Sequence, residues 1–389
     1  MQLHEFQAKD LLRRYQVDTP PGQIAVTPDE AAAAARQIGS DSLFVKAQIL
    51  AGDRAAAGGV RAVRSPSGAR AAAAELLGRN LATSQTGPAG YAVKRVLVEG
   101  AIAAAREFYL ALRVDPAAGS IAVLAGPHQA DMEQHLAAGA PGLQSLALDI
   151  AGKHKPGDLA EFGRRLGLTG EAAEQFGALV GRLHRAFVEL DATLIEINPL
   201  ILTASGGFVA ADAKLAIDDN AMFRHPETAQ LRSDEDIDQL QLQAQRHQIN
   251  YVQMDGNIGI VVNGAGLGLA TLDMVRAAGG APANFMDIRT TAKSLDIAHG
   301  VGMILDNPRA KVLLVNVYGG GMQACDTVVD GLAIAFRRSG RVIPMVLRIT
   351  GNNENFAHMR LANFNLPKTE CADMGQAAAR AVAIAQGRA

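Results

Sequence analysis

The sequence predicts an α/β protein built from two domains of different sheet type. Its 389 residues exceed the length that one typical hydrophobic core organises. Short strands and alanine-rich helices in the first half give way, near residue 240, to apolar strands that each run into a helix. A polar segment at 225–248 lacks a clear apolar face and is typical of a linker with a surface helix. We therefore expect one domain at 1–240 and a second at 241–389.

The composition favours small molecules or other proteins as partners. Lys and Arg number 37 against 39 Asp and Glu, a formal net charge of -2 that favours neither nucleic acid nor an anionic membrane. Residues 1–15 have the pattern of an amphipathic helix without the apolar core of a signal peptide, and no run of about 18 apolar residues occurs. Cys325 and Cys371 have no C-x-x-C spacing, which disfavours a disulfide framework or a structural zinc site. We expect a soluble, cytoplasmic protein.

The first half is expected to be an α+β or mixed-sheet domain. Residues 91–100 and 106–115 alternate apolar and polar side chains, as half-buried strands do. Residues 28–39 and 67–79 are rich in alanine, the best helix former.

The segment TLIEINPLIL at 193–202 is expected to be a buried strand that carries an acid and an amide. Side chains alternate across a strand, so Glu196 and Asn198 share one face while Ile195 and Ile197 share the other. An unpaired buried carboxylate is costly, so such a pair is usually satisfied by a cation, a metal or hydrogen bonds. Pro199 favours an edge strand or a strand end. Taken alone, the pattern favours a strand end whose polar face contacts solvent.

The second half is expected to be a parallel sheet with helices on both faces, because strand and helix alternate at 256–280, 310–336 and 342–349. Asn263 lies at the first turn from strand to helix, where tight-turn chemistry and anion binding are about equally supported. Gly319 to Gly321 open onto the next helix at the carboxyl edge of the sheet, where open α/β folds bind ligands. A phosphate or carboxylate site is the favoured interpretation there.

The chain resembles the β subunits of nucleoside-diphosphate-forming succinate–CoA ligases and the related large subunits of malate–CoA ligases. The resemblance implies an N-terminal ATP-grasp domain, a C-terminal flavodoxin-like CoA-ligase domain and a separate α subunit that carries a phosphohistidine and most of the CoA site. It covers nearly the whole chain. The matching motifs are LHEFQAKDLL at 3–12, VKAQILAG at 45–52, AGGVRAV at 57–63, LVEG with REFYLAL at 97–112, LIEINPL at 194–200, DAKLAIDDNAMFR at 212–224, NGAGLGLATLDM at 263–274, GGAPANFMD at 279–287 and GNN at 351–353.

Residue by residue, the resemblance implies a nucleotide site with Mg²⁺ and ATP or ADP. Asn198 and Asp212 would bind the Mg²⁺, and Glu196 would orient the histidine that receives the phosphoryl group. A proline at position 20 favours ATP over GTP as the nucleotide. The nucleotide-binding positions implied are Lys46, Asp53, Arg54, Ala55, Glu99, Ile102 and Glu107. The positions implied for the acid or phosphate are Asn263, Gly320, Gly321 and Met322.

Two loops depart from the family pattern. The glycine-arginine-glycine-lysine loop is replaced by residues 53–56, DRAA, where Asp53 should repel phosphates and alanine lacks the backbone freedom of glycine. Three glycines near the acid site are replaced by residues 289–291, where Arg289 could bind a carboxylate with two hydrogen bonds. An active ligase for succinate, a ligase for malate or a related acid, and a non-catalytic regulatory subunit all stay open. So does the choice between a dimer and a tetramer of the α/β unit.

Overall fold

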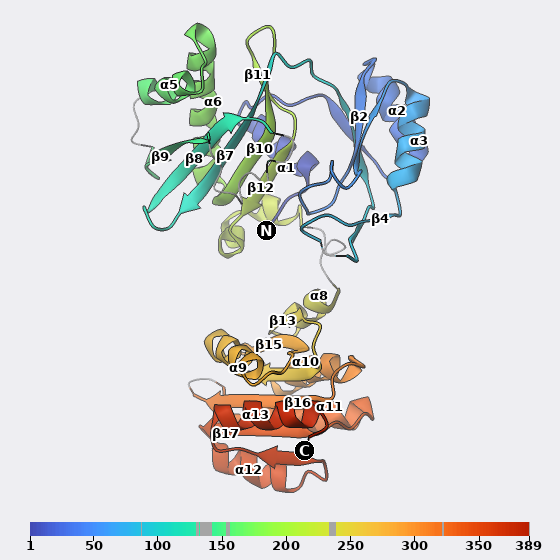
Figure 1. Cartoon of the computed structure of the whole chain (residues 1–389), viewed down its shortest axis with the longest axis vertical. Helices are drawn as coiled ribbons and strands as arrows, with labels where there is room; N and C mark the ends of the chain where they lie inside the picture. Colours follow the sequence, from blue (N-terminus) through green and yellow to red (C-terminus); the bar gives the residue numbers. More distant parts are fainter. Residues whose placement is uncertain are drawn as a thin grey trace. The chain divides into compact units, whose positions relative to one another are not determined.

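The structure is a computed structural model that describes residues 1–86, 88–129, 132, 142–152, 156–232, 239–320 and 323–388. The chain forms two compact units, Met1–Ser233 and Asp234–Ala389, and each is described here by itself (Figure 1). None of the helices in these described ranges has the length and apolar character needed to cross a membrane.

The first sheet of unit 1 is antiparallel, in the order β1-β6-β2-β3. Two alanine-rich helices, α2 and α3, pack on it around a core of small apolar side chains (Figure 1). Both helices begin as their sequences predict, with Thr27 and Ser65 accepting backbone N–H groups just before a proline in the first turn. The strands are β1 (Gly22–Ala25), β2 (Leu43–Ala47), β3 (Val60–Val63) and β6 (Val96–Gly100), and the helices are α2 (Pro28–Ile38) and α3 (Pro66–Leu76).

The second sheet of unit 1 is also antiparallel, in the order β11-β10-β7-β8-β9, with β12 pairing β10. Helices α1, α5 and α6 bury one of its faces, including Phe108, Leu110 and Leu112, whereas Tyr109 and Ala111 lie on the other face. The strands are β7 (Arg106–Asp115), β8 (Ser120–Pro127), β9 (Gln144–Leu148), β10 (Ala192–Leu202), β11 (Phe208–Ala210) and β12 (Ala213–Ile217). The helices are α1 (Glu5–Arg14), α5 (Pro156–Arg165), α6 (Gly170–Glu189), the 3-10 helix η1 (Asp219–Arg224) and α7 (Pro226–Ala229).

One strand expected in unit 1 is divided in two. Residues 91–100 form β5 (Tyr91–Ala92), which pairs with β4 (Asn80–Leu81), and then β6 in the first sheet. Between them Val93 donates its N–H to Arg79 and the carbonyl of Arg95 accepts from Gln48. These two bonds turn the chain away from a continuous strand that the alternation alone predicted.

Unit 2 has the expected parallel sheet with helices on both faces. Its order is β13-β15-β14-β16-β17-β18, and β13 is the antiparallel member, paired with β15. Helices α8, α10, α11 and α12 pack on one face and α9 and α13 on the other (Figure 1). The strands are β13 (Ile249–Gln253), β14 (Ile258–Val262), β15 (Asn284–Ile288), β16 (Val312–Gly319), β17 (Met345–Gly351) and β18 (Lys368–Glu370). The helices are α8 (Gln239–Arg246), α9 (Ala265–Ala277), α10 (Ser294–Asp306), α11 (Cys325–Ser339), α12 (Glu354–Ala362) and α13 (Met374–Ala385).

Candidate functional site

Strand β10 has the two faces expected from its sequence. Ile195 and Ile197 are fully buried against the helical side, and Glu196 and Asn198 lie on the opposite face. Pro199 lies within the strand rather than at its end. The pairing of β10 with β7 shifts register between Ile197 and Leu200, so the missing N–H of the proline falls where the ladder is interrupted.

The polar face of β10 forms one wall of a cavity of about 510 Å³ between the two sheets of unit 1. Strands β2 and β6 and the loop 52–56 form the facing wall, while β7, β10 and β12 complete the other. The volume falls in the range of small-molecule sites. The predicted residues that line this cavity are Lys46, Asp53, Arg54, Ala55, Glu99, Ile102, Glu107, Glu196, Asn198 and Asp212.

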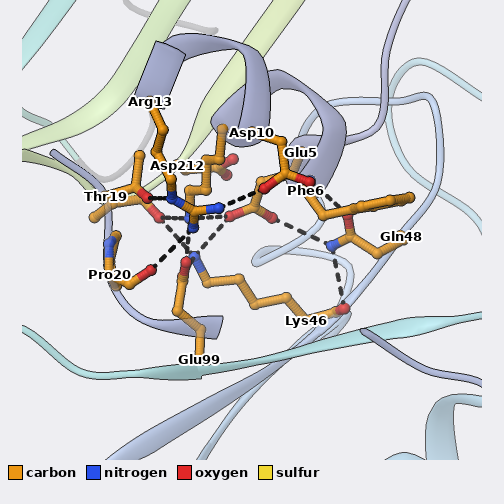
Figure 2. A network of polar contacts seen from close by, with 12 residues as sticks. Glu5, Phe6, Asp10, Arg13, Thr19, Pro20, Lys46, Gln48, Glu99 and Asp212 are labelled. Carbon is orange, nitrogen blue, oxygen red and sulfur yellow. Dashed lines mark hydrogen bonds and ion pairs between the residues drawn. The ribbon is translucent and has the colours of Figure 1, made fainter. Parts of the chain in front are cut away.

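Lys46 is buried within a network of charges and is not exposed to solvent at the end of its strand. Its Nζ lies 2.9 Å from Glu5 Oε1 and 2.8 Å from Glu99 Oε2 (Figure 2). It also donates to the carbonyl of Ala211 at 2.7 Å. Burial works to lower the pKa of Lys46, but the carboxylates of Glu5, Glu99 and Asp212 outweigh it and hold this pKa above its ordinary value. Lys46 therefore stays a cation.

The first turns of α1 supply residues that the sequence did not single out. Glu5 accepts from Lys9, Lys46 and Arg54 at 2.8 to 2.9 Å and is almost fully buried. Burial raises the pKa of Glu5, but these three cations more than reverse this and hold it well below 4.5. Glu5 and Lys9 are four residues apart, a spacing that usually indicates a solvent-exposed ion pair on a helix. The sequence signal that could have identified Glu5 and Lys9 as site residues was their position within the motif at 3–12.

Both carboxylate oxygens of Glu99 are occupied by ammonium groups. Oε1 is 2.5 Å from Lys9 and Oε2 is 2.8 Å from Lys46. Burial holds the pKa of Glu99 above its ordinary value, although the two lysines oppose that rise. Glu99 thus lines the cavity while its charge is held by the network.

Arg54 places its guanidinium on Asp212, the residue expected to bind metal. Its Nη2 lies 2.9 and 2.8 Å from the two oxygens of Asp212 and 2.8 Å from Glu5 Oε2, and Nη1 donates to the carbonyl of Ala47 at 3.0 Å. The side chain of Arg54 is 6% exposed, so these contacts are shielded from water. In this conformation, Asp212 already has a cationic partner.

The loop that carries Arg54 corrects one expectation from the sequence. Asp53 itself has the left-handed backbone, with φ +56°, followed by Gly58 at +75°, and Ala55 and Ala56 are not among the residues with positive φ. Alanine therefore causes no backbone strain here, and aspartate tolerates the left-handed region better than most residues. The carboxylate of Asp53 accepts a short hydrogen bond from Ser84. Asp53 therefore differs from the glycine of the family pattern chiefly in its negative charge.

Around Glu196 and Asn198 lie three further partners that sequence reasoning did not include. Glu196 pairs with Lys214 directly across the hairpin at 3.1 Å and accepts a hydrogen bond from Tyr109 at 3.4 Å. The Oδ1 of Asn198 lies 2.7 Å from Nδ1 of His128, which also lines the cavity. His128 comes within 4.0 Å of Glu107.

The pair Asn198 and Asp212 suits a hard divalent cation. The hairpin of β10 and β12 sets them opposite each other, with the N–H of Asn198 donating to the carbonyl of Asp212 at 3.2 Å. Both present side-chain oxygens, the ligand type that Mg²⁺ prefers, and Mg²⁺ commonly takes only one or two protein groups beside phosphate and water. Within the described part of the chain, no cluster of three or more His, Cys, Asp or Glu could hold a metal alone. The guanidinium on Asp212 indicates that a cation fits this position.

The carboxyl edge of the sheet in unit 2 holds the other predicted residues. Asn263 exchanges two hydrogen bonds with the backbone of Tyr318, at 2.7 and 2.9 Å, which fixes the turn after β14 to the end of β16. Gly320 bridges to Gln323. Gly321 and Met322 lie outside the described residues.

Arg289 lies at the end of β15 and is exposed. Its guanidinium donates to Asn250 Oδ1 at 3.1 and 3.3 Å. The neighbouring carboxylate of Asp287 instead accepts from the N–H of Gly264 at 2.6 Å and from Asn250 at 3.1 Å. Asp287 is therefore engaged elsewhere, and the nearby acid Asp296 accepts from the N–H of Lys293.

Comparisons with known proteins agree with these two units. A family model of the ATP-grasp domain matches residues 2–202, and a model of CoA-ligase matches residues 261–382, which confirms the expected fold class. The β subunit of ADP-forming succinate–CoA ligase from Anaeromyxobacter dehalogenans (strain 2CP-C) is 40% identical over 388 residues, which span 99% of this chain and 100% of that protein. The protein of the same name from Janthinobacterium sp. (strain Marseille) is 37% identical over the full length of both.

A solved structure shares the fold across the whole chain. The structure of ATP citrate lyase from Methanothrix soehngenii, in complex with citrate and coenzyme A, matches with a TM-score of 0.75 and covers 100% of both chains. Its sequence identity is 17%, so this likeness concerns the fold alone.

Proposed function

The chain belongs to the family of succinate–CoA ligase β subunits, as its motifs predicted, and we propose that it is the β subunit of an ATP-dependent acid–CoA ligase. In this proposal unit 1 binds the nucleotide and a separate α subunit carries the histidine that is phosphorylated. The γ-phosphoryl group of ATP passes to that histidine and then to a carboxylic acid, and the resulting acyl phosphate is attacked by the thiol of CoA, which releases phosphate.

The observation that carries the proposal is the gathering of the predicted residues around one cavity of unit 1. Ten side chains named from sequence motifs between residues 46 and 212 line it, although they come from six separate stretches of the chain. A site that had lost its function would have no reason to keep the basic and acidic groups in one cavity of nucleotide size. This favours an active subunit over a non-catalytic regulatory one.

The charges of the cavity favour a nucleotide bound together with Mg²⁺. Its acidic side chains outnumber its basic ones, and free ATP or ADP would add further negative charge. Mg²⁺, when bound, supplies the compensating charge on the phosphates, with Asn198 and Asp212 as its protein ligands. The basic residues that line the cavity are Lys46, Arg54 and Lys214, and the acidic ones are Asp53, Glu99, Glu107, Glu196 and Asp212.

Glu196 is proposed to face the acceptor histidine of the α subunit. Its carboxylate is mostly buried and held by Lys214, so its position is fixed before the histidine arrives. A carboxylate that accepts a hydrogen bond from one imidazole nitrogen leaves the other nitrogen free to attack phosphorus. Glu196→Gln should therefore impair phosphorylation of the histidine more than binding of ATP.

The acid is proposed to bind at the carboxyl edge of unit 2, near Asn263 and Gly320. Succinate follows from the family, and malate or a related dicarboxylate is the second candidate, because Arg289 adds a cation at this edge that could bind the carboxylate these acids share. Its guanidinium keeps part of its hydrogen-bonding capacity beyond the contact with Asn250.

The experiment is co-expression of the chain with the α subunit encoded beside it. Acyl-CoA formation from ATP, Mg²⁺, CoA and each of succinate, malate and related acids is followed by chromatography. We expect thioester formation with a dicarboxylic acid, and loss of it in Glu196→Gln. An assembled pair that binds Mg-ATP and forms no thioester with any acid would contradict the ligase assignment.

A further inference from the structure

Two lysines of unit 1 share one set of acceptors. Lys46 Nζ contacts Glu5 Oε1, Glu99 Oε2 and the carbonyl of Ala211. Lys9 Nζ contacts the same Glu5 oxygen at 2.8 Å, Glu99 Oε1 at 2.5 Å and the same carbonyl at 2.7 Å. An ammonium group has three N–H donors, so each lysine has used all of them. Lys46 can reach a nucleotide phosphate only by giving up one of these contacts.

The two lysines differ in their access to the cavity. The side chain of Lys46 is 9% exposed and lines the cavity, whereas that of Lys9 is 1% exposed, lies on α1 and is not among the lining residues. Only Lys46 is therefore in a position to exchange a carboxylate for a phosphate oxygen. If it does so, Glu5 and Glu99 lose one of their cations while they stay buried, and an uncompensated buried carboxylate is strongly unfavourable.

We propose that Lys9 is a positioning residue that acts through Lys46, by neutralising Glu5 and Glu99 so that Lys46 is free to bind the nucleotide phosphates. This inference rests on the proposed nucleotide site. Without Lys9, Lys46 is the only ammonium group on both carboxylates and is held by them. Glu5 is ionised in this network, since the surrounding cations hold its pKa well below its usual range. Its negative charge therefore needs a cation other than Lys46 when Lys46 binds a phosphate.

The net charge of the network distinguishes the proposed role of Lys9 from a merely structural one. The formal charges of Glu5, Glu99 and Asp212 are balanced by those of Lys9, Lys46 and Arg54, and Lys9→Met leaves this network with one negative charge in excess. The double variant Lys9→Met/Glu5→Gln restores neutrality although it removes still more native contacts. A structural role predicts that the double variant is at least as impaired as the single one, whereas the proposal predicts recovery.

The test uses the full chain and Mg-ADP as the probe, with affinity measured by isothermal titration calorimetry and folding by circular dichroism. We expect Lys9→Met to bind Mg-ADP about tenfold more weakly than the parent, and Lys9→Arg and the double variant to bind within about threefold of it. Lys94→Met removes an exposed lysine of the same unit and should leave the affinity unchanged.

The outcomes distinguish a failure of the proposed nucleotide site from a failure of the proposed role of Lys9. A parent chain that binds no Mg-ADP overturns the nucleotide site, and the role of Lys9 with it. A parent that binds, with Lys9→Met binding equally well, overturns the role of Lys9 alone. If Lys9→Met does not fold, the double variant still decides: affinity near that of the parent supports the proposal, and affinity at least tenfold weaker in a folded double variant overturns it.

Discussion

Replacing Glu5 by glutamine should strongly destabilise unit 1, and acid should diminish the effect. The carboxylate of Glu5 lies 2.8 to 2.9 Å from Lys9, Lys46 and Arg54 and is almost fully buried. Each contact contributes an attraction of about 6 kcal/mol at an effective dielectric constant of about 20, against a desolvation cost of several kcal/mol per ion. Leaving three cations with one acid fewer should lower the free energy of unfolding by about 3 to 5 kcal/mol.

The pH dependence follows from the direction of the pKa shift. In the folded chain the pKa of Glu5 is held well below the ordinary value of 4.5 by the neighbouring cations, although burial alone would raise it. A depressed folded pKa contributes stability above the unfolded pKa, and that stability is lost as the pH falls through the folded value. The difference between parent and Glu5→Gln should therefore be constant near neutral pH and shrink toward about pH 3.5.

Urea denaturation followed by circular dichroism, at neutral and acid pH, measures both quantities. Glu227→Gln is the matched control, because Glu227 is 84% exposed and pairs with Arg14 at 3.5 Å. Its effect should stay within about 0.5 kcal/mol. Equal effects of the two substitutions, or a Glu5 effect that does not change with pH, would refute the reasoning.

Three further substitutions test the sites themselves. Asp212→Ala should remove the Mg²⁺ dependence of nucleotide binding, and unchanged Mg-ADP affinity in calorimetry would exclude Asp212 as a ligand. Asp53→Asn removes the charge and keeps a side chain suited to φ +56°, so Mg-ADP should bind about threefold more tightly, unless the hydrogen bond from Ser84 already offsets that charge. Arg289→Gly should raise the Michaelis constant for the acid about tenfold and leave that for ATP nearly unchanged, whereas small, equal effects would show that Arg289 only holds Asn250.

The sequence by itself determined the elements and their exposed and buried faces. Ile195 and Ile197 lie on one face of their strand and Glu196 and Asn198 on the other because side chains alternate along a strand. Helices α2 and α3 begin at Thr27 and Ser65 because their caps are local in the chain. The alternation of strand and helix was likewise sufficient to predict the parallel sheet of unit 2.

Only the tertiary structure decided which charges meet. Glu5 and Lys9 have the spacing of a surface ion pair, yet α1 packs where the first sheet of unit 1 brings Lys46 and Glu99 beside it. Arg54 reaches Asp212 across 158 residues of sequence. The energy of such pairs depends on distance and on exclusion of water, and both are set by the packing of the two sheets rather than by any local pattern.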